Sequence, residues 1–268
     1  MSFLTNTSPS LPGLYVHIPF CASRCRYCSF ASNLYDMNLA DRYLDALHKE
    51  LAYHTDTLSV GISTLFIGGG TPSILTLQQM KLLLSQFQKY YTVEEFTVEC
   101  NPDSLSREKL SLLRQCGVNR LSIGVQTFNP DGLHLLGRRH TADAAKKAIT
   151  QAFEMGFTSV SLDLIIAWPG QTQEMLIQDL KTAISLGVTH ISCYNLIVEE
   201  KTAIFTDFAS GALIEKTDNE AREFWDISET YLAENGFDHY EISNFAKPEK
   251  QCKHNVNCWK GLDYIIRL

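Results

Sequence analysis

The chain has 268 residues, of which 45% are hydrophobic, 10% aromatic and 20% charged, so it can bury a sizeable core and is not a disordered polypeptide. Its 30 acidic and 23 basic residues give a net charge of -7, which lacks the broad positive field that non-specific nucleic-acid binding requires. We therefore expect no nucleic-acid partner.

Residues 1–13 are predicted to form an N-terminal arm with the sequence "MSFLTNTSPSLPG", which has neither the basic nor the apolar region of a secretory signal. No apolar segment of the chain reaches the roughly 20 residues that span a bilayer. We expect a cytoplasmic protein without stable membrane insertion. Because cytoplasmic thiols stay reduced, the eight cysteines indicate metal binding, rather than disulfides, where they cluster.

Strand-like and helix-like segments alternate along the chain. Runs of aliphatic and β-branched residues predict six strands, at Leu14–Ile18, Thr64–Ile67, Glu95–Glu99, Leu121–Val125, Ser159–Ile166 and His190–Ile197. Apolar spacings of three and four predict helices at Leu39–His54, Leu77–Tyr90, Ser106–Cys116, Ala142–Met155, Gln173–Leu186 and Asn219–Asn235. Strict alternation predicts parallel βαβ units in an α/β fold. Six units leave two candidates, an open partial barrel and a doubly wound sheet.

The predicted domain covers residues 14–236, and the alternation fades in residues 237–268, which we interpret as the start of a C-terminal region. Polar groups gather where the predicted strands end. These positions carry "GGGTP" after the second strand, Glu99 with "CNP", Gln126, Asp163 and "WPGQ". Functional groups of such folds collect at the C-terminal ends of strands. A polar ligand at this end explains why two carboxylates stand in predicted buried strands.

Three cysteines, Cys21, Cys25 and Cys28, follow the first strand within eight residues. Buried structural thiols are one interpretation, but the flanking Arg24 and Arg26 do not suit an apolar core. A structural zinc site is a second, although it normally has four ligands. The third is an iron-sulfur cluster in which three thiolates hold three irons and leave the fourth iron open for a ligand.

This spacing resembles the radical S-adenosylmethionine (SAM) superfamily, whose cluster donates an electron to SAM and cleaves it to a 5'-deoxyadenosyl radical. The segments "YVHIPFC", "FIGGGTPS", "VECNP", "NRLSIGVQTF", "LGRRH", "LDLI", "WPGQT", "YEISNFA" and "HNVNCW" resemble the oxygen-independent coproporphyrinogen III oxidase family over nearly the whole chain. The resemblance implies a partial β6/α6 radical SAM barrel with a 4Fe-4S cluster on the three cysteines. It also implies SAM contacts by Tyr15, Gly69, Gly70, Thr71, Glu99, Gln126, Arg138 and Asp163.

Two branches of this family differ in function. The oxidase decarboxylates coproporphyrinogen III, and its motif carries a further cysteine where this chain has Phe30. Phe30 and the short N-terminal arm resemble the HemW branch, described as heme chaperones. The expected partners are heme or a porphyrinogen, an electron donor to the cluster and a heme-accepting apoprotein. Three alternatives stay open: an enzyme of tetrapyrrole metabolism, a heme carrier, and an iron-sulfur protein with neither activity.

A heme-associated motif of the HemW branch, "HNxxYW", resembles "HNVNCW" at His254–Trp259, with Cys258 in place of the tyrosine. The resemblance implies that His254 contacts heme, and histidine is a common axial ligand. A loop histidine and a metal site with Cys252 and Cys258 are the alternatives. Family members continue beyond the final "GLDYIIRL", so we expect a truncated C-terminal extension.

Overall fold

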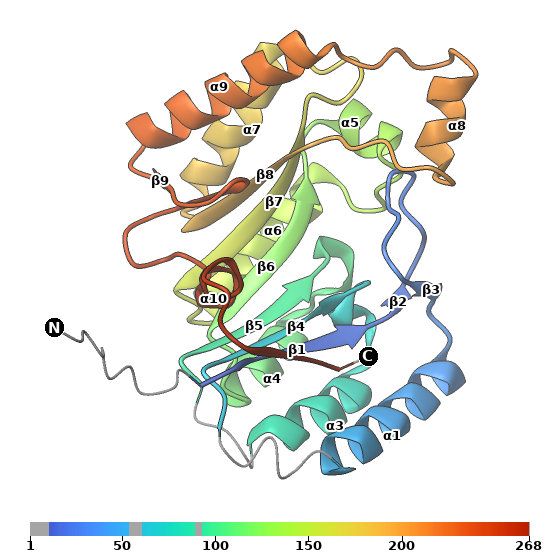
Figure 1. Cartoon of the computed structure of the whole chain (residues 1–268), viewed down its shortest axis with the longest axis vertical. Helices are drawn as coiled ribbons and strands as arrows, with labels where there is room; N and C mark the ends of the chain where they lie inside the picture. Colours follow the sequence, from blue (N-terminus) through green and yellow to red (C-terminus); the bar gives the residue numbers. More distant parts are fainter. Residues whose placement is uncertain (1–10, 54–60, 89–92, 268) are drawn as a thin grey trace, which may run out of the picture.

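A curved, mostly parallel β-sheet organises the computed structural model, which describes residues 11–53, 61–88 and 93–267 (Figure 1). Its central strands pair in parallel and in chain order: β1 (Gly13–Ile18), β4 (Thr64–Gly69), β5 (Glu95–Cys100), β6 (Arg120–Gln126), β7 (Ser159–Ile166) and β8 (His190–Asn195). The six predicted strands are confirmed, although β8 ends two residues before the predicted Ile197. No helix in this described part of the chain is both long and apolar enough to cross a bilayer.

A long helix lies between each central strand and the next, and another follows β8: α1 (Met37–Tyr53), α3 (Leu77–Gln88), α4 (Arg107–Gln115), α6 (Ala142–Glu154), α7 (Gln173–Ser185) and α9 (Asp218–Glu234). Two predicted helix ends, His54 and Tyr90, lie outside the described residues. Local signals explain where several helices begin. The hydroxyl oxygens of Thr141 and Thr172 accept hydrogen bonds from the first turns of α6 and α7, and Thr217 forms a capping box with Glu220 at the start of α9.

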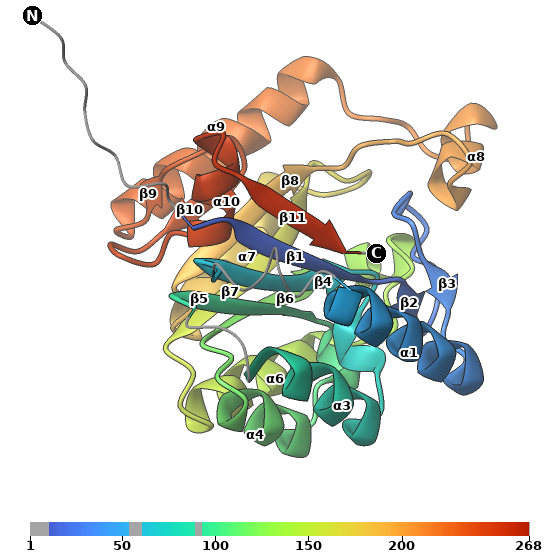
Figure 2. The ribbon, with the colours of Figure 1, turned by 60° about the horizontal axis from the view of Figure 1, so that its bottom comes forward.

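The two faces of the sheet differ in polarity. Because side chains alternate along a strand, Leu121, Ile123 and Val125 of β6 pack in the core under the helices, and the residues between them face inward. The same alternation places a polar set on the inner face: Glu95, Thr97, Glu99, Arg120, Ser122, Ser161, Asp163, His190 and Ser192. The main helices cover the outer face (Figure 2). This arrangement is the partial barrel, since a doubly wound sheet has helices on both faces.

The C-terminal residues join both edges of this sheet. Strand β11 (Tyr264–Arg267) pairs in parallel with β1, and β10 (Asn244–Ala246) pairs antiparallel with β8 and with β9 (Asp238–His239). Helix α10 (Lys253–Trp259) contacts β4. In Figure 1, α10 and β9 lie at the end of the sheet where the central strands begin. The division of the chain at residue 236 stays a prediction.

Smaller elements lie where the central strands end. Strands β2 (Phe20–Cys21) and β3 (Asn33–Leu34) form a separate parallel pair after β1. Helices α5 (Pro130–Leu135) and α8 (Ala203–Ala209) follow β6 and β8, and short 3₁₀ turns, Pro72–Ile74 and Pro102–Ser104, follow β4 and β5. The chemistry-bearing segments noted in the sequence therefore meet at one end of the barrel.

Candidate functional site

The three cysteines lie in one loop at the end of β1. The pairing of Phe20 with Asn33 and of Cys21 with Leu34 closes this loop, and within it Cys28 donates its backbone N–H to the Cys25 carbonyl at 3.3 Å. All three thiols are free and half-buried. We call residues 21–34 the cysteine loop.

The glycine turn after β4 packs against the cysteine loop. A Cβ at Gly70 would lie 2.8 Å from the carbonyl oxygen of Phe20 and 3.0 Å from the Cys21 sulfur, so only glycine allows this approach. The next residue, Thr71, donates its hydroxyl to the Cys21 Sγ at 3.6 Å. Gly69 has a φ of 112°, in the region that favours glycine, and donates its N–H to the Glu99 carboxylate at 3.0 Å.

A half-buried arginine reaches a second cysteine. Arg138 Nη1 donates to the Cys25 Sγ at 3.3 Å, while its Nη2 donates to Asn101 Oδ1 at 2.7 Å and to the Gly124 carbonyl at 2.6 Å. The Nε of Arg138 is buried without a hydrogen-bond partner. The guanidinium therefore places positive charge beside the thiols, where it stabilises thiolates, and keeps one unused donor.

These residues fit a cluster better than a single metal ion. Among the described residues, no three His, Cys, Asp or Glu side chains converge on one ion, whereas a 4Fe-4S cluster binds each cysteine through its own iron and needs no common point. Burial raises the pKa of the Cys28 thiol, and the neighbouring Cys25 and Cys21 add to this effect. A bound metal cation would favour the thiolate form of Cys28. The donor set and the Gly70 contact fit the cluster that the sequence predicted.

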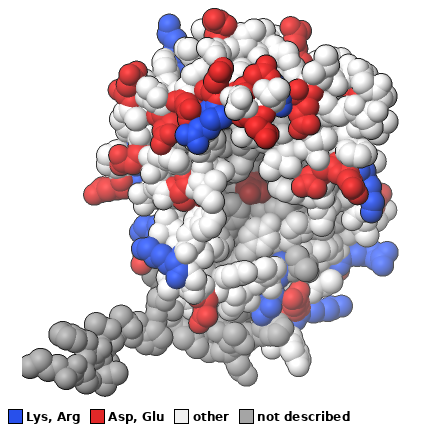
Figure 3. Space-filling view, turned by 45° about the horizontal axis from the view of Figure 1, so that its top comes forward, with Lys and Arg blue, Asp and Glu red and all other residues white. Residues whose placement is uncertain are grey.

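Two carboxylates face each other inside the barrel near the loop. Burial and then the charge of Asp163 raise the pKa of Glu99 to about 8. Burial also raises the pKa of Asp163, although Arg120 opposes this, and Ser122 donates its hydroxyl to the Asp163 carboxylate at 3.3 Å. Figure 3 shows a hollow with an acidic residue in its depth. A cationic ligand would lower both pKa values, so the pair suits an ammonium group.

Tyr15 lies on the inner face of β1. Its ring stacks on Phe66 with centroids 5.9 Å apart, and its hydroxyl forms a 3.2 Å hydrogen bond with His17 Nδ1. Burial, and after it the Glu99 charge, raises the pKa of the phenol well above its usual value. Tyr15 is therefore a neutral hydrogen-bonding group beside the carboxylates.

Gln126 occupies a strained backbone position at the end of β6. Its φ is 71°, and the register between β6 and β7 shifts between Gly124 and Gln126. The buried Asp179 of α7 holds the next two residues, because it accepts from the Thr127 hydroxyl at 2.6 Å and the Phe128 N–H at 2.8 Å. Such strain persists only where surrounding contacts impose it, and it is common at functional sites.

His254 is not brought to this site. Its ring packs against Gly13, the first residue of β1, where an added Cβ would lie 3.2 Å from the imidazole. Since β1 rises by roughly 3.3 Å per residue, its other end at Ile18, which precedes the cysteine loop, lies about 16 Å from Gly13. His254 is only 5% exposed, and its Nδ1 forms a 2.9 Å hydrogen bond with Thr64 Oγ1. The alternative of a surface loop histidine is wrong, because His254 is a buried residue of α10.

Hydrogen bonds between Glu95 and the N-terminus of α10 hold His254 in this position. Glu95, at the start of β5, accepts from the N–H of Lys253 at 3.0 Å and of His254 at 3.1 Å, and from the Cys252 thiol at 3.4 Å. A carboxylate at a helix N-terminus satisfies donors that have no partner within the helix. Cys252 and His254 therefore already have protein partners, and Cys258 is exposed.

Three residues that contact the site were not among the site residues predicted from the sequence. Asn101 lies inside the quoted "CNP" segment directly after Glu99, a position that could have revealed it. Arg26 of the cysteine loop pairs with Asp207 of α8, a contact across 181 positions that no local pattern indicates. Asp179 appears in the sequence as one more polar residue of an amphipathic helix.

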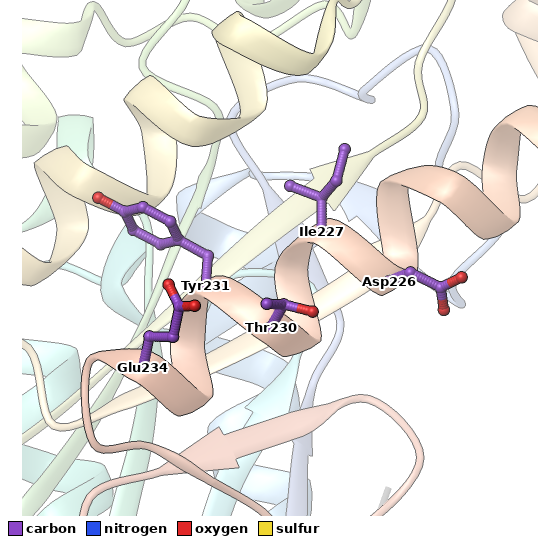
Figure 4. Close-up of a pocket in the computed structure, with 5 residues that line it drawn as sticks. All are labelled: Asp226, Ile227, Thr230, Tyr231 and Glu234. Atoms are coloured by element: carbon purple, nitrogen blue, oxygen red, sulfur yellow. The ribbon is translucent and has the colours of Figure 1, made fainter.

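The pocket in Figure 4 lies elsewhere. Its lining residues all belong to α9: Asp226, Ile227, Thr230, Tyr231 and Glu234. Their side chains point in several directions along the helix and do not converge on a ligand position. This depression has no part in the site at the strand ends.

Comparisons with known proteins agree with this geometry. The Radical SAM superfamily model matches residues 15–183. The chain is 40% identical over 256 residues to "Heme chaperone HemW" of Bacillus subtilis (strain 168), covering 94% of this chain and 68% of that protein. It is 36% identical over 260 residues to "Heme chaperone HemW" of Escherichia coli (strain K12), covering 94% and 67%.

Among solved structures, coproporphyrinogen III oxidase (HemN) from Escherichia coli, described as a radical SAM enzyme, superposes with a TM-score of 0.80 at 29% identity. That comparison covers 95% of this chain and 59% of the oxidase. The chain thus spans about two thirds of the length of the two HemW proteins and less of HemN. The chain belongs to the radical SAM superfamily and, within it, to the HemW family.

Proposed function

We propose that this chain binds a 4Fe-4S cluster through Cys21, Cys25 and Cys28 and binds SAM beside it, and that it acts in heme delivery as a HemW-type heme chaperone. The observation that carries the proposal is the arrangement of three free cysteines in one loop, two of which receive hydrogen bonds to sulfur from Thr71 and Arg138. Cys21, Cys25 and Cys28 would hold the cluster, which when bound would supply the electron that cleaves SAM. The protein residues hold the ligands and control their charge.

The inner carboxylates support the SAM assignment. The ammonium group of the methionine moiety would pair with Glu99 or Asp163, whose pKa values are raised by burial in the absence of a cation. Gly69 holds the Glu99 carboxylate through its N–H, and Arg138 retains an unpartnered buried Nε that suits a carboxylate. Tyr15 and Gln126 complete the proposed contacts from the neighbouring strands.

Phe30 favours the carrier over the oxidase. It occupies the position where the oxidase motif has a further cysteine, and it is 70% exposed on the cysteine loop. The oxidase remains the second candidate, supported by the structural similarity to HemN. Anaerobic reconstitution followed by parallel assays for iron, 5'-deoxyadenosine, coproporphyrinogen decarboxylation and heme binding separates them. We expect heme binding near one per chain and no decarboxylation, and robust formation of protoporphyrinogen IX would assign the oxidase.

Heme ligation by His254 needs a separate test because this residue is buried. If its imidazole ligates heme, His254→Ala shifts the Soret band or lowers affinity, while Thr64→Val, which removes only the hydrogen bond to Nδ1, leaves the band unchanged. Loss of stability in both variants with an unchanged Soret band would instead make His254 a structural residue. His239→Ala is the control for loss of a histidine outside this motif, since His239 pairs with Glu229 on the surface. It should leave the Soret band unchanged. Cys258→Tyr, which restores the family tyrosine, should increase heme affinity.

The remaining partners follow from this function. An electron donor must reduce the cluster, and an apoprotein must accept heme. Acidic side chains gather above the hollow in Figure 3, which indicates that a donor or acceptor docking on that part of the face would present basic residues. Association of an acceptor with this face should therefore weaken as salt concentration rises.

A further inference from the structure

The side chain of Asn101 connects two of the groups that reach the cysteines. Its Oδ1 accepts from Arg138 Nη2 at 2.7 Å, and its Nδ2 donates to Thr71 Oγ1 at 3.1 Å. The orientation of the amide is chemically determined, because a guanidinium can only donate and must face the oxygen. Asn101 is itself held in place, since its backbone N–H donates to Ser73 Oγ at 3.0 Å.

This amide determines where the Thr71 proton points. Thr71 Oγ1 accepts from Asn101, so its own O–H is left to donate, and its acceptor is the Cys21 sulfur at 3.6 Å. Without the amide N–H, the Thr71 hydroxyl would be free to rotate toward another acceptor. The hydrogen bond to Cys21 therefore depends on Asn101.

The same amide orients the arginine. The guanidinium group of Arg138 is planar, and its Nη2 donates to both Asn101 Oδ1 and the Gly124 carbonyl oxygen. This leaves Nη1 facing the Cys25 sulfur at 3.3 Å. One asparagine thus directs one donor to each of two cysteine sulfurs.

We propose that Asn101 is a positioning residue that directs hydrogen bonds to the sulfurs of Cys21 and Cys25 and thereby raises the reduction potential of the cluster. The inference rests on the proposed cluster ligation. Reduction adds negative charge that is shared with the ligand sulfurs, so donors aimed at those sulfurs stabilise the reduced form more than the oxidised form.

The test is an EPR-monitored redox titration, without SAM, of the anaerobically reconstituted full chain. Asn101→Leu, which keeps the volume and adds no charge, should make reduction about tenfold less favourable, a fall of 59 mV for a one-electron couple. Thr71→Val, which removes only the hydroxyl, should lower the potential by a smaller amount, and Thr71→Ser should restore it. Asn119→Leu is the matched control. Asn119 also bridges two groups, accepting from Phe96 N–H and donating to the Glu94 carbonyl, but at the other end of β5.

A double-mutant cycle separates the effect that Asn101 has on Cys21 through Thr71 from the effect that it has on Cys25 through Arg138. The Thr71→Val variant has already lost the hydrogen bond to the Cys21 sulfur. Adding Asn101→Leu to it should therefore lower the potential less than Asn101→Leu does in the wild type. Fully additive shifts would overturn the inference, because Asn101 would then not act through Thr71. A structural role for Asn101 would change iron content or stability without changing the potential of the cluster that remains.

The outcomes distinguish this inference from the proposed function. If the wild-type chain forms no cluster, the proposed function fails. If it forms a cluster whose potential is the same in wild type, Asn101→Leu and Thr71→Val, cluster ligation stands and the role of Asn101 is refuted. If Asn101→Leu does not retain iron, the comparison of Thr71→Val with Thr71→Ser decides, and equal potentials refute the proposal.

Discussion

Replacing Glu99 by Gln should make the stability of the protein less dependent on pH. Burial and Asp163 raise the pKa of Glu99 from 4.5 to about 8, so the folded protein holds this proton more tightly than the unfolded chain. The stability that the proton contributes is fully present below pH 4.5 and is lost as pH rises toward 8. At 1.36 kcal/mol per pKa unit, the loss in the free energy of unfolding has an upper limit of about 5 kcal/mol.

The expected loss is smaller than this limit because Glu99 is only partly buried, and water that reaches the carboxylate weakens the effect. We expect the wild type to lose about 2 kcal/mol more than Glu99→Gln between pH 5 and pH 8. Urea unfolding of the anaerobically reconstituted protein without SAM measures this difference. Adding SAM at pH 8 should recover part of the wild-type loss, since its ammonium group favours the ionised carboxylate.

The control is Glu154→Gln, which removes a carboxylate of α6 that pairs with Arg107 and whose side chain is 51% exposed. Its pH dependence should match that of the wild type. Parallel stability curves for wild type and Glu99→Gln over this pH range would refute the reasoning, because the carboxylate would then have the same pKa in the folded and unfolded states.

Three further predictions concern the cysteine loop. Cys28→Ala should abolish the cluster absorption and iron content, while Cys116→Ala, at the end of α4, should leave both intact, and equal iron in the two variants would contradict the ligand assignment. Gly70→Ala should lower stability in urea by about 1–3 kcal/mol and reduce iron loading, because the new Cβ meets the Phe20 backbone at 2.8 Å; normal iron loading would argue against the close fit. Asp207→Asn should speed iron release to a chelator with a stability change below about 1 kcal/mol, since the ion pair with Arg26 is partly exposed, and an unchanged release rate would mean that α8 does not restrain the loop.

Much of the fold could be predicted from local patterns. The outer residues of β6, Leu121, Ile123 and Val125, alternate with inner polar residues, and this period of two survives in the structure because one face packs under helices. Helix starts were predictable where Ser or Thr precedes the helix, as at Thr217. The α/β class and the polar strand ends followed from these patterns, which left the partial barrel and the doubly wound sheet as alternatives. The resemblance to the family implied the partial barrel.

The site was predictable where its residues sit at strand ends and unpredictable where a contact joins distant segments. Glu99, Gln126 and Asp163 were identified because parallel strands bring their C-terminal ends to one edge. The contact of Asn101 with Thr71 and Arg138 spans 30 and 37 positions, and the docking of α8 on the cysteine loop through Arg26 spans 181. No periodicity encodes such pairs.

His254 illustrates the same limit. The motif "HNVNCW" indicated heme contact, but only the tertiary structure shows that α10 docks on Glu95 at the start of β5. Its ligand role therefore remains a prediction.

The sequence by itself determined the α/β class, the six βα units, the three clustered cysteines and the family, because these depend on residue types at short, regular spacing. Only the tertiary structure decided which donors face Cys21 and Cys25 and at which end of the barrel His254 lies. It also decided that Glu99 and Asp163 lie partly buried near each other, which raises the pKa of both. These properties depend on distances of a few ångströms between segments far apart in the chain, and such distances follow from packing of the whole barrel and not from any local pattern.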